Sequence, residues 1–246
     1  MRVGVNSRLL LKDKLEGIGY FTLKNLERLA KNHPDCEFVL FFDRPYDRDF
    51  VFADNVKPIV IPLPTRHPML WHIYFEILLP IYIRLYKIDV FFSPEGYIPT
   101  RVKTPKLCTI HDINFEHEKT YIGNKVYQRY MEYFTPRFAK SANVVLTVSE
   151  FSKQDIATTY KIDENKIFNV ESSANEEYIT YSEKENQITR ERYSNSCPYF
   201  YFVGSLQKRK NLTNLFRAFD LFKEKTQSNV KLVIVGSKKW WKGEIE

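Results

Sequence analysis

Cysteines are few in this sequence, and those present form no group. Cys36, Cys108 and Cys197 are odd in number and widely separated, with no CxxC pair and no neighbouring histidine cluster. This pattern argues against a zinc site and against a disulfide framework, and it favours a reducing compartment, the cytoplasm. No metal is expected.

Long apolar runs are lacking as well. The opening MRVGVNSRLL contains too short an apolar run for a signal peptide and predicts a first strand. The longest apolar patch, residues 69–86, is interrupted by His72, Glu76, Pro80 and Arg84. It falls short of the roughly 20 continuous apolar residues that a membrane span needs. No span is expected, and there are neither internal repeats nor low-complexity tracts.

The composition is that of a globular protein. The 246 residues are 43% hydrophobic and 15% aromatic, enough for one large or two modest domains with buried cores. The formal charge of +7 favours anionic partners, namely nucleotides, phosphorylated sugars, a membrane surface or nucleic acid. Nucleic acid is disfavoured, because the cations are dispersed and balanced by 30 acids instead of forming a stripe with aromatics.

Strand-like and helix-like runs alternate along most of the chain. Continuous apolar strands separated by helices predict a mostly parallel sheet covered by helices on both faces, which is a doubly wound α/β domain. The predicted strands are 3–6, 37–42, 57–62, 89–94, 106–112, 143–149 and 166–172, and the predicted helices are 20–32, 125–140 and 150–160.

Two domains are predicted. The first, a Rossmann-like domain, covers 1–174, and the polar segment 175–197 is interpreted as an interdomain linker. The strand–helix rhythm then restarts in 198–246, with a strand, a helix and a second strand. Two strands and one helix cannot bury both faces of a parallel sheet, so this second domain is expected to be incomplete.

Ligands of doubly wound sheets bind beyond the carboxyl ends of the strands, where helix N-termini receive anions. Gly17 and Gly19 precede a predicted helix and would let backbone N–H groups approach a phosphate; the alternative is a flexible turn. His111 and Asp112 follow a predicted strand. The imidazole could hydrogen-bond a sugar hydroxyl or assist proton transfer, or it could merely hydrogen-bond a neighbouring loop.

Ser149 follows another predicted strand and is interpreted as a helix N-cap, with a ligand contact as the alternative.

Three cations, Lys208, Arg209 and Lys210, separate a predicted strand from a predicted helix. Cations at a helix N-terminus oppose the helix dipole by about 0.3–1 kcal/mol each when unpaired. A bound pyrophosphate would compensate for this, since arginine offers a planar fork and lysine a point charge. The alternative is a solvated basic turn.

Six segments, taken in order, carry a resemblance to a known family. They read GIGYFTLKNLERL, DVFFSPEGYIP, IHDINF, ANVVLTVSEFSKQDI, YFVGSLQKRKNLTNLFRAF and LVIVGSKKWW. In these residues the chain resembles the retaining glycosyltransferases of family 4, the glycosyl transferases group 1, over nearly its whole length. The VG followed by RKNL is the most specific element, and VSEFSK is the next.

This resemblance implies a GT-B architecture, with a nucleotide-sugar between an acceptor domain and a donor domain. Arg209 and Lys210 match the basic pair that neutralises the donor diphosphate, and Gly17 and Gly19 match the glycine loop facing it. His111 matches the histidine near the transferred sugar. The donor would be UDP- or GDP-linked, and no further cofactor is implied.

The chain also departs from the family pattern. Members usually carry a Glu-x7-Glu motif later in the second domain, which these 246 residues do not reach. Ser205 stands where some members have Arg, and residues 172–175 read SSAN where many members have Asn-Gly.

The expected function is transfer of a hexose, with retention, to a glycan or lipid-linked acceptor in cell-surface polysaccharide or lipopolysaccharide biosynthesis. The alternative is a truncated protein that binds acceptor or nucleotide without turnover. Hydrolysis is disfavoured because no carboxylate pair of the glycosidase type stands out. The short length argues against a sucrose- or glycogen-type synthase.

The aromatic segment 66–87 has two interpretations. Its tryptophan, tyrosines and basic residues would suit peripheral membrane association near a lipid-linked acceptor, at the inner face of the membrane. A core helix is the favoured interpretation, because no strong polar face accompanies the apolar residues.

Overall fold

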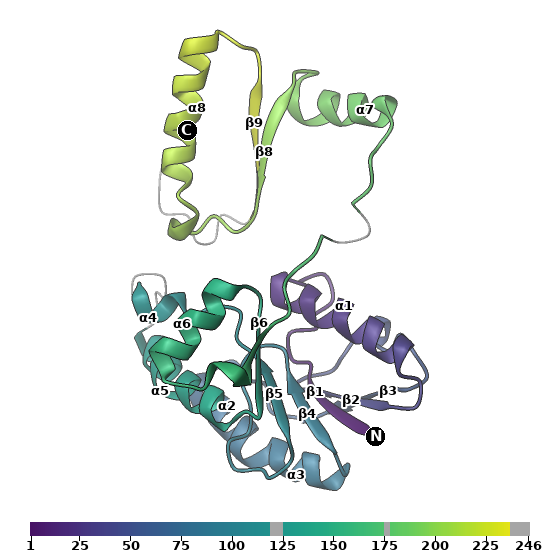
Figure 1. The fold of residues 1–246 in the computed structure, drawn as a ribbon. Helices are drawn as coiled ribbons and strands as arrows, with labels where there is room; N and C mark the ends of the chain where they lie inside the picture. Colours follow the sequence, from purple (N-terminus) through teal and green to yellow (C-terminus); the bar gives the residue numbers. More distant parts are fainter. Residues whose placement is uncertain (119–124, 175–177, 237–246) are drawn as a thin grey trace. The chain divides into compact units, whose positions relative to one another are not determined.

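The computed structural model describes residues 1–118, 125–174 and 178–236, and the chain forms two compact units, Met1–Ser172 and Ser173–Glu246. Figure 1 shows the elements of both units. The last residues of the predicted LVIVGSKKWW segment, from 237 onward, lie outside the described residues.

The first unit is built on a parallel sheet of seven strands in the order β3-β2-β1-β4-β5-β6-β7. After β3 the chain crosses to the other side of β1, so the topological switch point lies between β1 and β4. The predicted doubly wound α/β class is confirmed. The strands are β1 Arg2–Asn6, β2 Glu37–Phe42, β3 Val56–Val60, β4 Val90–Ser93, β5 Lys106–Thr109, β6 Val144–Thr147 and β7 Ile167–Asn169.

Helices connect these strands. Of the three helices whose bounds were predicted, α5 and α6 lie within one residue of the prediction, but α1 begins three residues before the predicted start, so its first turn contains both glycines. The helices are α1 Gly17–Asn32, η1 Arg48–Phe50, α2 Pro68–Ile73, η2 Tyr74–Leu78, α3 Leu79–Leu85, α4 Asn114–His117, α5 Lys125–Ser141, α6 Glu150–Tyr160 and η4 Glu164–Lys166.

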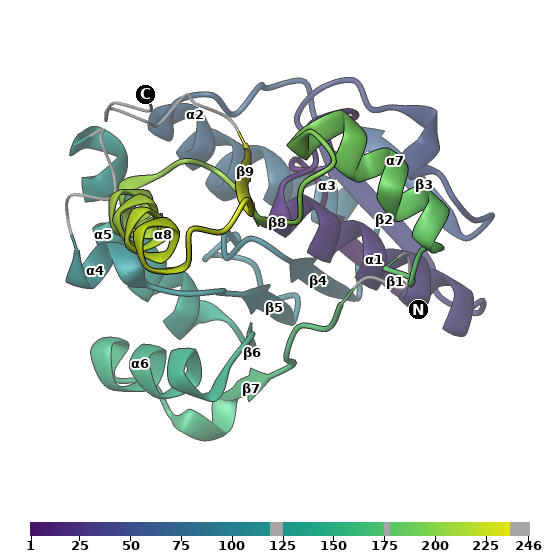
Figure 2. The same cartoon turned by 90° about the horizontal axis from the view of Figure 1, so that it is seen from above.

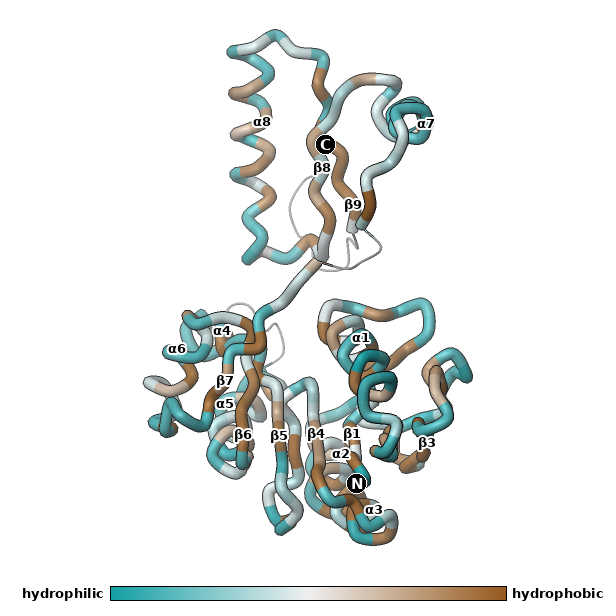
Figure 3. The backbone as a smooth tube through the Cα atoms, turned by 45° about the vertical axis from the view of Figure 1, so that its right-hand side comes forward, coloured by the Kyte–Doolittle hydropathy of each residue, from teal (hydrophilic) through white to brown (hydrophobic). Residues whose placement is uncertain are grey.

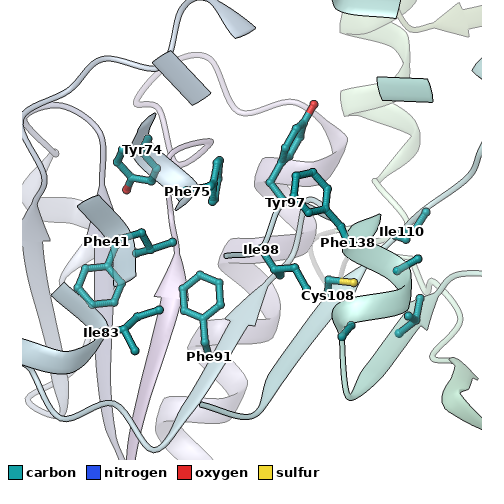
Figure 4. Close-up of a cluster of buried hydrophobic side chains, with 14 of the residues drawn as sticks. Phe41, Tyr74, Phe75, Ile83, Phe91, Tyr97, Ile98, Cys108, Ile110 and Phe138 are labelled. Atoms are coloured by element: carbon teal, nitrogen blue, oxygen red, sulfur yellow. The ribbon is translucent and has the colours of Figure 1, made fainter. Parts of the chain in front are cut away.

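The sheet separates two hydrophobic clusters, one on each face. Figures 1 and 2 show strands β4 to β6 between α1 on one side and α6 on the other. The larger cluster joins the strands to η2, α3, α5 and α6, and Figure 4 shows its centre, around Phe41, Phe91, Cys108, Tyr74, Phe75 and Phe138. The smaller cluster joins Val5, Leu40 and Phe42 to Leu26 and Ala30 of α1. Strands buried on both faces explain the continuous apolar runs in the sequence.

The α1 face of the sheet contains an apolar hollow. Phe21 and Leu29 of α1, with Val90, Leu107 and Leu146 of the strands, line an apolar hollow of about 390 Å³. The prediction of helical cover on both faces therefore holds, but the cover on this side leaves space over β4, β5 and β6.

The aromatic segment forms one continuous helix, α2–η2–α3, whose middle is a π-helical turn. The Leu79 N–H bonds to the Tyr74 carbonyl, five residues back, and Pro80, which has no N–H, follows at once. The wide turn keeps Tyr74, Leu79 and Ile83 buried on one side although their spacing changes from five residues to four. In the described part of the chain, no helix is both long and apolar enough to span a bilayer.

The second unit contains a two-stranded parallel sheet among its described residues, with β8 (Tyr199–Val203) beside β9 (Lys231–Val235). Helix α8 (Leu212–Thr226) connects the strands, after the short turn η5 (Lys208–Lys210). Figure 3 shows both strands as largely hydrophobic and α7 (Glu183–Ser194) as largely hydrophilic.

Helix α7 lies inside the segment 175–197, which the sequence predicts to be a linker. Its N-terminus is closed by a capping box between Ser182 and Glu185, and the helix contacts β9 of the second unit. The linker prediction is thus corrected for residues 183–194. Pattern analysis misses this helix because its polar residues lie on nearly every face.

The hydroxyl of Tyr74 offers a test of the core. The ring is fully buried and its oxygen has no hydrogen-bond partner among the described residues. Tyr74→Phe should therefore leave the free energy of unfolding unchanged or raise it by up to about 1 kcal/mol. Tyr74→Ala, the matched cavity variant, should lower it by about 3–5 kcal/mol. Urea denaturation followed by circular dichroism measures both, and a loss above about 1 kcal/mol in Tyr74→Phe would contradict the assignment.

Candidate functional site

Polar and charged side chains collect at the carboxyl edge of the seven-stranded sheet. Arg8 follows β1, Asp43 follows β2, Glu95 follows β4, His111 follows β5 and Ser149 follows β6. In doubly wound sheets this edge binds ligands, above all at the switch point, which here lies between β1 and β4.

A buried ion pair occupies the switch point. The side chains of Arg8 and Glu95 are 8% and 4% exposed, and the Arg8 Nε donates to the Glu95 Oε1. Asn6, the last residue of β1, donates from Nδ2 to the same oxygen at 2.5 Å and to the Ser93 Oγ at 3.0 Å. The ends of β1 and β4 are therefore joined by side chains as well as by the sheet.

Three aromatic rings surround the Arg8 guanidinium. Its central carbon lies 5.3 Å from the ring centre of Trp71, 5.8 Å from Phe75 and 4.8 Å from Tyr97. Burial alone would lower the pKa of Arg8, but attraction and hydrogen bonding from Glu95 outweigh it and raise the pKa. The guanidinium stays charged inside an apolar cage.

The network continues to the ends of β2 and β3. The Arg8 Nη1 donates to the Thr65 Oγ1 at 3.1 Å, and Thr65 donates from N and Oγ1 to the Asp43 Oδ2 at 2.8 and 2.5 Å. Arg44 forms a bidentate pair with the same carboxylate. Burial would raise the pKa of Asp43, but the hydrogen bonds from Arg44 and Thr65 prevail and lower it. One polar network thus connects four strand ends.

Sequence reasoning misses Arg8, Asp43 and Glu95. Each stands within two residues of the end of a strand, and two of them flank the switch point. The switch-point rule, applied to the first and fourth predicted strands, could have found Arg8 and Glu95.

His111 is held in one orientation at the end of β5. Its Nε2 lies 3.0 Å from the Pro94 carbonyl oxygen, which can only accept, so Nε2 carries the proton. The Phe21 ring of α1 packs against the imidazole edge-on at 4.9 Å. Burial lowers the pKa of His111, although the bond to Pro94 and the charge of Asp112 oppose the shift. A neutral ring in this tautomer leaves Nδ1 as a hydrogen-bond acceptor.

Asp112 and Ser149 have local structural roles. The exposed Asp112 accepts a hydrogen bond from the Asn114 N–H at 3.1 Å, at the start of α4. Ser149 caps α6, its Oγ accepting from the Ser152 N–H at 3.1 Å, so the predicted N-cap is confirmed. Ligand contacts of both residues stay predictions.

The two glycines at the start of α1 differ in their surroundings. A Cβ on Gly19 would lie 2.8 Å from the Leu15 Cδ2 and 3.0 Å from the Leu9 carbonyl oxygen, so packing requires this glycine. A Cβ on Gly17 would meet nothing within 4 Å. Within the described chain, α1 begins without a side-chain cap and without an acid in its first turn, which leaves N–H groups for an anion.

In the second unit, the basic turn lies directly before α8. Arg209 and Lys210 are exposed residues of η5, and Arg209 donates from Nε to the Gln207 side chain at 3.0 Å. Among the described residues, no carboxylate forms an ion pair with either cation, and the first turn of α8 contains no acid. Ser205 is half-buried, and its carbonyl accepts from the Gln207 N–H.

Comparison with known proteins gives consistent matches. The model of "Glycosyltransferase Family 4" matches residues 15–170, and that of "Glycosyl transferases group 1" matches residues 183–246. The O-antigen chain mannosyltransferase B of Escherichia coli is 26% identical over 94% of this chain and 63% of its own length. The O-antigen chain mannosyltransferase RfbU of Salmonella typhimurium is 29% identical over 68% of this chain and 43% of its own. The chain therefore spans less than two thirds of either relative.

Solved structures share the fold. Sucrose-phosphate synthase from Thermosynechococcus elongatus superposes with a TM-score of 0.69 at 13% identity, over 96% of this chain and 62% of its own. The Anabaena protein HepE, in complex with UDP and glucose, gives 0.62 at 10% identity, over 95% of this chain and 60% of its own. At such identities these matches establish the fold, which is of the GT-B type.

Removing one partner of the buried ion pair should strongly lower the free energy of unfolding. Glu95→Ala leaves a buried cation without its partner and should lower the free energy of unfolding by about 3–5 kcal/mol. Replacing both partners, Arg8→Met with Glu95→Leu, should recover most of that loss, because no charge stays buried. Urea denaturation of both variants checks this, and a loss below about 1 kcal/mol in Glu95→Ala would contradict it.

The depressed pKa of His111 predicts a pH dependence of stability. NMR titration should give a pKa below the ordinary value of 6.5. As the pH falls through 6.5, the unfolded chain takes up this proton before the folded one, so the free energy of unfolding decreases until the folded pKa is passed. His111→Gln should remove this contribution. Identical pH profiles of the variant and the parent would contradict the assignment.

Proposed function

The chain belongs to glycosyltransferase family 4, and from that premise we propose that it transfers a hexose from a nucleotide-sugar to a glycan or lipid-linked acceptor with retention of configuration. Both curated relatives described above are O-antigen chain mannosyltransferases. Their names favour mannose as the transferred sugar and a cell-surface polysaccharide as the product.

The basic turn before α8 is the observation that carries the proposal. Arg209 and Lys210 stand exposed at a helix N-terminus, where their charges oppose the dipole and no described carboxylate pairs with them. A nucleoside diphosphate supplies the missing negative charge. Arginine can hold two phosphate oxygens at once, and lysine adds a compact charge beside it.

The same arrangement suits the chemistry of the transfer. The bond between the sugar C1 and the diphosphate oxygen breaks, a bond from C1 to the acceptor hydroxyl oxygen forms, and negative charge grows on the departing nucleoside diphosphate, which can take up the hydroxyl proton. Fixed cations and N–H groups stabilise that charge without having to reorganise. Arg209 and Lys210 are assigned to this role, with Ser205 as a further candidate contact.

In the first unit, Gly17 and the N-terminus of α1 are also assigned to the diphosphate. The open space at Gly17 allows a phosphate to approach the backbone, whereas Gly19 secures the packing of the turn. His111 is assigned to the transferred sugar, because a neutral imidazole with its proton on Nε2 can accept a hydrogen bond from a sugar hydroxyl at Nδ1.

Nucleotide binding tests the assignment at the basic turn. Calorimetric titration should show micromolar binding of GDP or UDP, and weaker binding of the corresponding monophosphate, which lacks the second phosphate group. Lys210→Ala should weaken diphosphate binding about tenfold or more, because a charge-assisted hydrogen bond is lost. Arg209→Ala should act in the same direction.

The matched control is Lys225→Ala, which removes an exposed cation from the last turn of α8, at the end away from the basic turn, and should leave binding unchanged. Binding that is equally tight in the Lys210→Ala variant would contradict the assignment. Binding without sugar transfer to any offered acceptor would instead support a protein that holds its ligand without turnover.

A further inference from the structure

The helix α2–η2–α3 has an apolar stripe on the side opposite its buried one. Met69, Ile77, Ile81 and Leu85 are 69%, 51%, 55% and 67% exposed. They follow one another at multiples of four residues, so they form a line along the helix. The sequence left two interpretations of this segment, core helix or membrane contact; the structure confirms the buried face and shows that the opposite face is exposed and apolar.

Exposed cations outnumber exposed acids in the segments that contain and follow this stripe. Between residues 66 and 103 the exposed acid is Asp89, whose carboxylate accepts from the Arg2 N–H. The exposed cations of the same range are five, namely Arg66, Arg84, Lys87, Arg101 and Lys103. A surface that combines exposed aliphatic side chains with an excess of cations matches an anionic lipid surface in both respects.

Two contacts bring the cations of separate segments to this helix. Glu76, next to Ile77, accepts from the N–H and the hydroxyl of Thr100 at 3.0 and 2.9 Å. The loop carrying Arg101 and Lys103 is thereby attached beside the middle of the stripe. Arg84 belongs to the helix itself, and Arg66 and Lys87 flank its two ends.

The stripe also leads to the candidate site. Its first residue, Met69, lies two positions before Trp71, whose ring packs against the Arg8 guanidinium at the carboxyl edge of the sheet. The Trp71 Nε1 additionally donates to the Thr65 carbonyl oxygen, so this end of the helix is fixed to the site network. A lipid surface along the stripe would therefore end beside that network.

We propose that the stripe Met69–Ile77–Ile81–Leu85 and the exposed cations named above bind the surface of an anionic phospholipid bilayer. This inference rests on the proposed function, for which it favours the lipid-linked class of acceptor. The aliphatic side chains enter the headgroup boundary, and the lysines and arginines contact the lipid phosphates. The buried face of the helix stays in the core.

Sedimentation with vesicles tests the proposal. The chain should bind vesicles of phosphatidylcholine mixed with phosphatidylglycerol far better than vesicles of phosphatidylcholine alone, and salt should weaken the binding. Ile77→Ser with Ile81→Ser should lower the partition coefficient about tenfold or more. Arg101→Glu with Lys103→Glu should do the same on the anionic vesicles.

Matched controls exclude general effects of polarity and charge. Phe151→Ser removes an aromatic side chain that is 76% exposed on α6, and Lys31→Glu with Lys184→Glu makes the same change in net charge elsewhere. Both should bind like the parent chain. Thermal unfolding followed by circular dichroism confirms that every variant is folded.

Three outcomes would overturn the proposal. The first is no binding to either kind of vesicle, and the second is binding that the stripe variants leave unchanged. The third is a dimer in light scattering that the stripe variants dissociate, which would assign the stripe to a second copy of the chain. Nucleotide titration tests the basic turn of the second unit. A failure of the vesicle experiment would therefore not by itself contradict the proposed function.

Discussion

A buried guanidinium is stable only beside a carboxylate, and Glu95 is that partner for Arg8 at the switch point between β1 and β4. The contact joins the residues after β1 to those after β4, and Asn6 adds a second bond to the same oxygen. The aromatic cage ties in the start of α2 through Trp71, and Thr65 carries the connection to Asp43. The positions of four strand ends therefore depend on one charge being satisfied.

That dependence matters for the loops that carry the candidate ligand contacts. The segment from Arg8 to Gly17 is fixed at one end by the ion pair and at the other by the tight approach of Gly19 to Leu9 and Leu15. His111 is held by Pro94, the residue immediately before Glu95. A site that must receive a charged donor gains from such a preformed frame, because less order has to be created when the ligand binds.

Much of this fold could be predicted because parallel strands buried on both faces leave unmistakable apolar runs, such as Glu37–Phe42. The N-cap at Ser149 could also be predicted, because capping depends only on residues close in the sequence. Helix α7 could not be predicted, because a capping box and a charged pair stabilise it and it has no apolar stripe. The Arg8–Glu95 pair joins residues far apart in the chain, and only the strand order brings them together. The roles of Gly17, Arg209 and Lys210 toward a ligand remain predictions.

The π-helical turn of Tyr74–Leu78 has a consequence for how this protein can change over generations. A π turn holds one residue more than an α turn. A single-residue deletion there would turn the five-residue spacing of Tyr74 and Leu79 into the four-residue spacing of an ordinary α-helix, so Leu79 and Ile83 would still face the core. A deletion in a regular α turn of the same helix would instead rotate everything after it by about 100° and take the buried side chains away from the core. The π turn is therefore the place in this helix where its lineage should accept the loss of one residue.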